Sequence, residues 1–293
     1  MTELTRRVAF GVVAAPVALA IVLAGGPALA GLLAVASAIA AWEFFRIART
    51  AGHLPLSDLG AALAGLLPLG VHAVYLGLMQ PRFSYLALVL LLLLSLAIWM
   101  RGTAGKPLGA VATTVLGVLY TGGLLSFGYA IRNHDYAVGE IRVGAIPIAA
   151  GGVLLGLPLL LTWATDIGAF FVGRTVGGPK LIPAVSPAKT VSGAVGGVVV
   201  SVIVAWVYVS YALKPAAQLA LSAAGIIIFG VVISVAAQLG DLVESLFKRE
   251  AGVKNSSELL PGHGGVLDRL DSLFFVLPTA HLLLGWLLMP APR

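Results

Sequence analysis

The sequence predicts an all-α, polytopic integral membrane protein of about nine transmembrane helices, with its N-terminus inside. Of the 293 residues, 59% are hydrophobic and only 10% are charged, whereas soluble domains carry about 25% charged residues. The mean hydropathy of +1.03 indicates that lipid surrounds most of the chain. The absence of cysteine excludes disulfides, thiolate metal sites and a cysteine nucleophile.

Nine apolar runs approach the roughly 20 residues that a helix needs to cross a bilayer. They cover residues 8–25, 27–45, 59–79, 83–100, 108–131, 145–165, 191–213, 216–240 and 270–289. The first run follows Arg6 and Arg7, but it is longer than the ~7–15 residues of a signal-peptide core, so we expect a retained span. Many runs are rich in Gly and Ala, which favours close packing between helices.

Lysine and arginine are distributed unequally between the two sides of the predicted membrane. With the N-terminus inside, the inside segments hold 13 of the 18 Lys and Arg residues. The outside segments hold the other five: Arg82, Arg132, Arg142, Lys214 and Arg293. This bias follows the positive-inside rule and accounts for the net charge of +6 without a nucleic-acid partner.

Acidic residues gather in two inside segments, about 165–190 and 241–271. They are Asp166, Asp241, Glu244, Glu250, Glu258, Asp268 and Asp271. The spacing of three between Asp241 and Glu244, and between Asp268 and Asp271, places each pair on one helix face. Such carboxylates could hold Mg²⁺, which prefers carboxylate oxygens and shares its shell with substrate phosphates. A solvated loop with helix-capping acids is the alternative, and the pattern alone leaves both open.

Two shorter groups could bind an anion. Ser186 and Thr190 are suited to cap a helix that begins near Val191, and the free N–H groups of its first turn lie beside Lys189. A capped membrane helix with an inside lysine is the simpler interpretation. His263 could polarise or protonate a phosphate oxygen, although a lone histidine is more often a structural residue.

The segment from Ser245 to Asp271 resembles the signature of the phosphatidate cytidylyltransferases, also called CDP-diacylglycerol synthases. Its Ser-x-Phe-Lys-Arg run, the later Lys254 and the His-Gly-Gly-Val-x-Asp-Arg-Leu-Asp run match every fixed position but one. Asn255 stands where the family has aspartate. Residues 166–170 and 186–193 resemble two further family segments, with Ala188 in place of a lysine and Ser192 in place of a glutamate.

The resemblance implies a Mg²⁺-dependent nucleotidyltransferase that converts CTP and phosphatidate into CDP-diacylglycerol and pyrophosphate. It also implies a K⁺ site and a homodimer. The implied metal ligands are Asp241, Asp268 and Asp271. Lys248 and Arg249 join these acids as catalytic residues because cations neutralise phosphate charge. The resemblance places Ser186, Lys189 and Thr190 in the family's phosphate-contacting segment. We expect Asp166, Lys254, His263 and Arg269 to bind substrate as well.

We expect one membrane domain, with N-terminal helices at 1–143 and a C-terminal half at 144–293 that carries the catalytic site. The site should face the cytoplasm, where CTP is found, from the inner membrane of the cell. A secondary transporter is a competing interpretation, although transporters place their sites near the midplane between repeats. A non-catalytic lipid-binding membrane protein is another, and Asn255, Ala188 and Ser192 are its only support.

Overall fold

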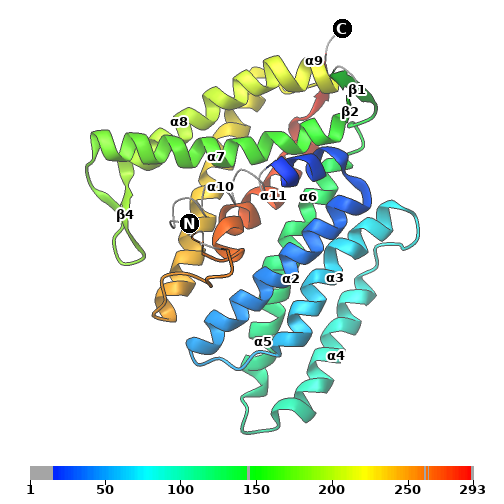
Figure 1. Ribbon diagram of the computed structural model, residues 1–293, viewed down its shortest axis with the longest axis vertical. Coiled ribbons are helices and arrows are strands. Elements are labelled where there is room, and N and C mark those ends of the chain that lie inside the picture. The colour runs from blue at the N-terminus through cyan, green and yellow to red at the C-terminus, as the bar shows by residue number, and fades with distance from the viewer. Residues whose placement is uncertain (1–15, 144–145, 261, 263, 292–293) are drawn as a thin grey trace. The chain divides into compact units, whose positions relative to one another are not determined.

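The computed structural model describes residues 16–143, 146–260, 262 and 264–291 (Figure 1). Eight helical segments within these residues are long and apolar enough to cross a membrane. They are α2 (Gly26–Thr50), α3 (Ser57–Tyr75), α4 (Phe83–Arg101), Pro107–Arg132, α7 (Ala150–Val176), Val191–Ala217, α10 (Ala223–Glu250) and α11 (Leu267–Leu287). The predicted all-α, polytopic membrane architecture is therefore confirmed.

Two of these segments contain a short π-helical stretch. The first comprises α5 (Pro107–Val118), η1 (Leu119–Gly123) and α6 (Leu124–Arg132). The second comprises α8 (Val191–Tyr208), η2 (Val209–Leu213) and α9 (Lys214–Ala217). Of the first predicted span, 8–25, residues 8–15 lie outside the described part of the chain, and residues 16–24 are helical. The total of nine helices and the side of the N-terminus stay predictions.

Two helices continue well beyond the ends of the apolar runs. The run at 145–165 predicted a helix that ends before Asp166, but α7 continues to Val176. The run at 216–240 likewise ends before Asp241, but α10 continues to Glu250. Hydropathy marks where lipid contact ends, whereas a helix ends only where its hydrogen bonding stops. The acids at 166 and 241 therefore lie on helices and not in loops.

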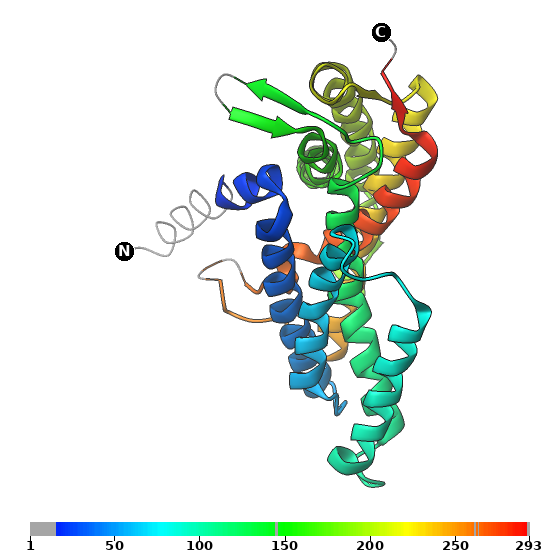
Figure 2. The same cartoon turned by 90° about the vertical axis from the view of Figure 1, so that its right-hand side faces the viewer.

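The described residues also form three two-stranded antiparallel ribbons, which hydropathy did not predict. They pair β1 (Glu140–Val143) with β2 (Ile146–Ala149), β3 (Lys180–Ile182) with β4 (Ser186–Thr190), and β5 (Leu219–Ala220) with β6 (Met289–Pro290). Figure 2 shows β1 and β2 as paired arrows that lead into α7. The ribbon of β3 and β4 connects α7 to α8 and replaces most of the loop expected there.

The contacts within the chain divide it into two compact units. Unit 1 contains Gly26–Ser126 and Phe247–Arg269, and unit 2 contains Phe127–Leu246, Leu270–Arg293 and the segment Ala15–Gly25. The last residues of α10 and the first of α11 thus belong to unit 1, and the rest of both helices belongs to unit 2. The expected division near residue 143 stays a prediction.

The core of unit 1 is built from α2, α3, α4 and α5, which lie side by side (Figures 1 and 2). Leu56, Leu93 and Val111 form a buried apolar cluster at its centre. The ring of Phe44 in α2 meets the ring of Phe247 in α10 edge to face, with 5.7 Å between centroids. This contact fixes the C-terminal end of α10 against α2. Phe247 directly precedes the signature residue Lys248.

The core of unit 2 is built around the long contact between α7 and α8. Tyr208 in α8 donates to the backbone carbonyl of Val153 in α7 at 2.7 Å. Ser201 of α8 donates to the backbone carbonyl of Gly230 in α10 at 2.9 Å. These bonds satisfy hydroxyl groups inside a membrane-spanning bundle, where an unsatisfied polar group is costly. They hold α7 to α8 and α8 to α10.

Candidate functional site

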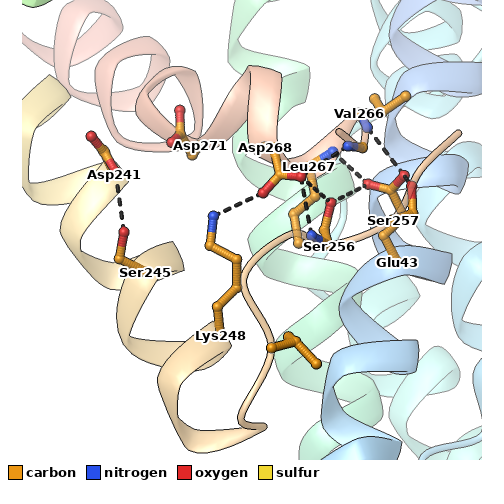
Figure 3. A network of polar contacts seen from close by, with 12 residues as sticks. Glu43, Asp241, Ser245, Lys248, Ser256, Ser257, Val266, Leu267, Asp268 and Asp271 are labelled. Carbon is orange, nitrogen blue, oxygen red and sulfur yellow. Dashed lines mark hydrogen bonds and ion pairs between the residues drawn. The ribbon is translucent and has the colours of Figure 1, made fainter. Parts of the chain in front are cut away.

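In unit 1, the signature segment folds around the carboxylate of Asp268, in the first turn of α11 (Figure 3). One oxygen, Oδ1, accepts from the Lys248 ammonium at 2.8 Å. The other, Oδ2, accepts from the backbone N–H of Ser256 at 3.0 Å, the Ser256 hydroxyl at 2.9 Å and the backbone N–H of Gly265 at 2.8 Å. The side chains of Lys248 and Asp268 are only 11% and 9% exposed. The pair therefore interacts with little screening by water.

A second carboxylate, Glu43 of α2, lies in the same network and is completely buried. The single hydrogen of the Ser256 hydroxyl is shared between Glu43 Oε2, at 3.0 Å, and Asp268 Oδ2, and Glu43 Oε2 also accepts from the backbone N–H of Leu267 at 2.6 Å. Its Oε1 accepts from the Ser257 hydroxyl and from the backbone N–H of Val266 at 3.1 Å. Figure 3 shows both oxygens directed at these four donors. Glu43 thus occupies the N-terminus of α11, where free N–H groups need acceptors.

The surroundings of position 265 explain why the signature has a glycine there. A Cβ atom at this position would collide with the Ser256 hydroxyl and with both carboxylate oxygens of Glu43. Because the loop passes so close to the two acids, only a residue without a side chain fits.

A cavity of about 360 Å³ opens beside this network in unit 1. It is lined by Lys248, Lys254, Asn255, Gly262, Gly264, Asp268 and Arg269. Three cations and one carboxylate in so small a volume leave a net positive charge, which suits a polyphosphate. The structure thus brings together four of the predicted site residues: Lys248, Lys254, Asp268 and Arg269.

A separate cavity of about 780 Å³ lies in unit 2. Its charged lining residues are Asp166, Arg174, Lys180, Lys189 and Asp241. Its apolar lining includes Ala169, Phe170 and Leu181. Three cations and two carboxylates beside an apolar wall suit a ligand that carries both phosphate and hydrocarbon. Asp166, Lys189, Thr190 and Asp241, predicted from two distant segments, all line it.

The predicted helix cap lies at the edge of this cavity. Thr190 is the N-cap of α8, and its hydroxyl accepts from the backbone N–H of Gly193 at 3.1 Å, as predicted. Lys189 forms an ion pair with Asp241, with 2.6 Å between Nζ and Oδ2. Ser186 was expected to help cap the helix, but it lies in β4 opposite Ile182. It is too far along the strand to replace Thr190 at the cap.

Two of the predicted metal ligands lie on adjoining helices of unit 2. A Cβ atom at Gly240 of α10 would lie 2.5 Å from the backbone oxygen of Asp271 in α11. Because the two helices approach so closely here, Asp241 of α10 and Asp271 of α11 lie on adjacent turns of the two helices. Asp241 also accepts from the Ser245 hydroxyl at 3.3 Å, and Asp271 accepts from the backbone N–H of Ser272 at 2.6 Å. Within the described part of the chain, no group of three or more His, Asp or Glu side chains could hold a metal ion.

Two predicted site residues remain, Arg249 and His263. Arg249 is exposed in the last turn of α10, and its guanidinium donates to the backbone carbonyl of Val253 at 3.4 Å. His263 lies outside the described residues. The catalytic, substrate-binding and metal-binding roles of all these residues stay predictions.

Glu43 was missed by the sequence reasoning, although it carried a usable signal. It is an ionisable residue within an apolar run, at 27–45, and such residues are expensive in a membrane and usually functional. The Lys and Arg count used to assign the sides of the membrane gives no weight to a single acid inside a span. Its partners lie more than 200 residues away in the sequence, so only the fold reveals them.

Comparison with known proteins agrees with the resemblance carried by the signature. Residues 5–287 match the cytidylyltransferase family. A protein of Bacillus subtilis named phosphatidate cytidylyltransferase is 32% identical over 297 residues, which cover 97% of this chain and 99% of that protein. Proteins of the same name from Staphylococcus saprophyticus and Haemophilus influenzae are 47% and 44% identical over 125 and 128 residues. Those two alignments cover 43% and 44% of this chain, and 46% and 44% of the two relatives.

Proposed function

Because the chain belongs to the cytidylyltransferase family, we propose that it converts CTP and phosphatidate into CDP-diacylglycerol and pyrophosphate in phospholipid biosynthesis. The observation that carries this proposal is the folding of the signature into a cationic cavity around the Lys248–Asp268 pair. The family assignment and this cavity disfavour a transporter, whose site is expected at the midplane.

The cavity of unit 1 has the charge that the triphosphate of CTP requires. Lys248 is held by Asp268, so its ammonium points in a fixed direction, while Lys254 and Arg269 are exposed cations on the same wall. An arginine can contact a phosphate through two parallel hydrogen bonds, and a lysine acts as a point charge. We therefore assign Lys248, Lys254 and Arg269 to neutralising the triphosphate.

The cavity of unit 2 has the character that a lipid phosphate requires. Lys189, Lys180 and Arg174 supply positive charge, and Phe170 and Leu181 supply apolar surface. Lys189 also lies at the N-terminus of α8, where the helix dipole favours an anion. We assign the phosphate of phosphatidate to this end of the cavity.

Magnesium fits the carboxylates of unit 2. Asp241 and Asp271 lie on adjoining turns, and hard carboxylate oxygens are the ligands that Mg²⁺ prefers. Mg²⁺ is commonly held by one or two carboxylates together with substrate phosphates, so a cluster of three acids is not required. When bound, the ion would neutralise phosphate charge at the reacting centre. Asp268 stays a predicted ligand as well. Both oxygens of Asp268 accept from Lys248 and the 256–265 loop, as both oxygens of Asp241 accept from Lys189 and Ser245.

The residues of the chain contribute mainly position and charge to the reaction. An oxygen of the phosphatidate phosphate attacks the α-phosphorus of CTP, a bond to this oxygen forms, and the bond to pyrophosphate breaks. A phosphate monoester is already largely ionised at pH 7, so no general base has to remove a proton. The barrier comes from repulsion between two anions. Lys248 and Arg269 would reduce the charge of CTP in unit 1, and Lys189 that of the lipid phosphate in unit 2.

Pyrophosphate release tests the proposed function directly. The purified protein in detergent is given CTP, Mg²⁺ and a panel of lipid phosphates, and we expect release with phosphatidate. Replacing CTP with another nucleoside triphosphate, or removing Mg²⁺ with a chelator, should lower the rate. Absence of release with every lipid, together with substrate uptake into liposomes, would contradict the proposal and favour a transporter.

Asp241→Asn tests most directly whether the carboxylates of unit 2 take part in the reaction. It keeps the shape of the side chain but removes the charge that pairs with Lys189, so we expect turnover to fall roughly 100-fold or more. Asp58→Asn, on an exposed acid in the first turn of α3, is the matched control and should be fully active. Unchanged turnover in Asp241→Asn would remove this residue from the proposed site.

We also propose that the protein is a homodimer in the inner membrane, with its site facing the cytoplasm. The excess of Lys and Arg in the inside segments supports the orientation, and CTP is a cytoplasmic substrate. Crosslinking in native membranes tests the dimer, because a monomer would give no band of doubled mass.

A further inference from the structure

The most unusual polar group outside the proposed catalytic set is the Glu43 carboxylate. It is fully buried within a membrane-spanning helix, where removing a charge from water costs several kcal/mol. Its contacts are two hydroxyls and two backbone N–H groups, all without formal charge. Hydrogen bonds to an ionised acceptor are roughly twice as strong as neutral ones, so three of them, together with the Ser256 hydroxyl that Glu43 shares with Asp268, can hold the charge in place.

The four donors come from the two ends of one segment, residues 256–267. Ser256 and Ser257 begin this segment, in the connection between Glu250 at the end of α10 and Leu267, whereas Val266 and Leu267 lie at the start of α11. Each Glu43 oxygen accepts one hydroxyl from the first end and one N–H from the second. Glu43 therefore ties together the two ends of the segment that lines the cationic cavity (Figure 3).

The effect of Glu43 reaches the proposed catalytic pair through Ser256. The hydroxyl of Ser256 lies 3.0 Å from Glu43 Oε2 and 2.9 Å from Asp268 Oδ2, and its backbone N–H also donates to Asp268. Asp268 in turn holds Lys248. A displacement of Ser256 would change the direction of the Asp268 carboxylate and, with it, the position of the Lys248 ammonium.

We propose that Glu43 is a positioning residue that sets the geometry of Lys248 and Asp268 by clamping the 256–267 loop from α2. The kinetic effect that this inference predicts rests on the proposed function. The structural effect, the ordering of the loop, can be measured without any substrate.

Glu43→Gln tests the clamp because it preserves size and removes the charge. Oε1 and Oε2 each accept a backbone N–H, so the amide nitrogen of glutamine must face one of these donors. We expect kcat to fall by about 10–100-fold, as the loss of a charge-assisted hydrogen bond predicts, with the KM for CTP changed less than about threefold. Hydrogen–deuterium exchange of residues 256–267 should become faster.

Glu250→Gln is the matched control, since Glu250 is an exposed glutamate of the same unit whose Oε1 lies 3.4 Å from Nε2 of the exposed His53, away from the 256–267 segment. It should keep the wild-type kcat and the wild-type exchange of the loop. Wild-type kcat and exchange in Glu43→Gln would overturn the proposal, as would a uniform rise in exchange over the whole chain, which indicates general destabilisation.

Two serine variants keep the proposal testable if Glu43→Gln does not fold. Ser256 contacts Glu43 and Asp268, whereas the Ser257 hydroxyl contacts Glu43 but not Asp268 in the network. We expect Ser256→Ala to lower kcat at least about threefold more than Ser257→Ala. Equal effects would overturn the transmission through Ser256. If the wild-type protein released no pyrophosphate, the proposed function would fail, and the exchange of the loop would still decide the role of Glu43.

Discussion

At the scale of single residues, two buried carboxylates organise the signature loop. Asp268 accepts donors from Ser256, Gly265 and Lys248, and Glu43 accepts donors from both ends of the loop. Asp268→Asn, which removes the charge of a predicted metal ligand, is therefore a poor probe of metal binding. It would disturb the loop as well as any metal, because an amide nitrogen would face N–H donors.

Gly265→Ala should damage both stability and activity. Its new Cβ atom has no room between Ser256 and Glu43, so the loop must shift, at a cost of about 1–3 kcal/mol. The expected result is a lower melting temperature in detergent together with slower pyrophosphate release. Gly109→Ala is the control, because Gly109 lies in a helix with open space around its Cβ position, and alanine is favoured there. Equal melting temperatures for the two variants would contradict the close contact at Gly265.

At the scale of elements, α7 and α10 carry acids of unit 2 because both helices continue beyond the ends of their apolar runs. Asp166 lies on α7 and Asp241 on α10, and both line the same cavity. The ribbon of β3 and β4 returns the chain so that Lys189 comes directly before α8. The position of Lys189 opposite Asp241 thus depends on how β4 joins α8.

Thr190→Val should weaken this junction. Valine keeps the branched shape but cannot accept the bond from the Gly193 N–H, so the N-terminus of α8 should lose about 0.5–2 kcal/mol. We expect a lower melting temperature and reduced turnover, because Lys189 precedes the cap. Thr175→Val is the control. It removes an exposed hydroxyl that donates to a backbone carbonyl of its own helix, and the melting temperature should stay within experimental error of wild type. A Thr190→Val variant as stable as wild type would argue against the cap.

At the scale of the whole molecule, the unequal distribution of Lys and Arg predicts an alternating topology that labelling can check. The chain has no cysteine, so a single introduced cysteine reports only its own position. In intact cells, a membrane-impermeant maleimide should label Gln80→Cys, in the predicted outside segment between α3 and α4. It should not label Thr103→Cys, in the predicted inside segment between α4 and α5.

Both of these positions are exposed, so burial within the protein does not protect either of them. After the membrane is permeabilised, both cysteines should react. The opposite labelling pattern in intact cells would invert the topology and place the Lys- and Arg-rich segments outside, away from CTP.

The amino-acid sequence by itself determined the membrane class, most of the helices and the signature residues. These properties depend on local composition: apolar runs of sufficient length, positive charge beside them and fixed spacings such as that from Lys248 to Asp268. Helix ends were poorly predicted, as at Val176 and Glu250, because hydropathy reports lipid contact rather than hydrogen bonding.

Only the tertiary structure decided which distant residues meet. The pairing of Lys189 with Asp241 and the clamp of Glu43 on the 256–267 loop join segments that are far apart in the chain. A sequence of helices fixes which side chains are available, but not which helix faces which. That choice belongs to packing, because a buried carboxylate is stable only where the fold brings enough donors to it.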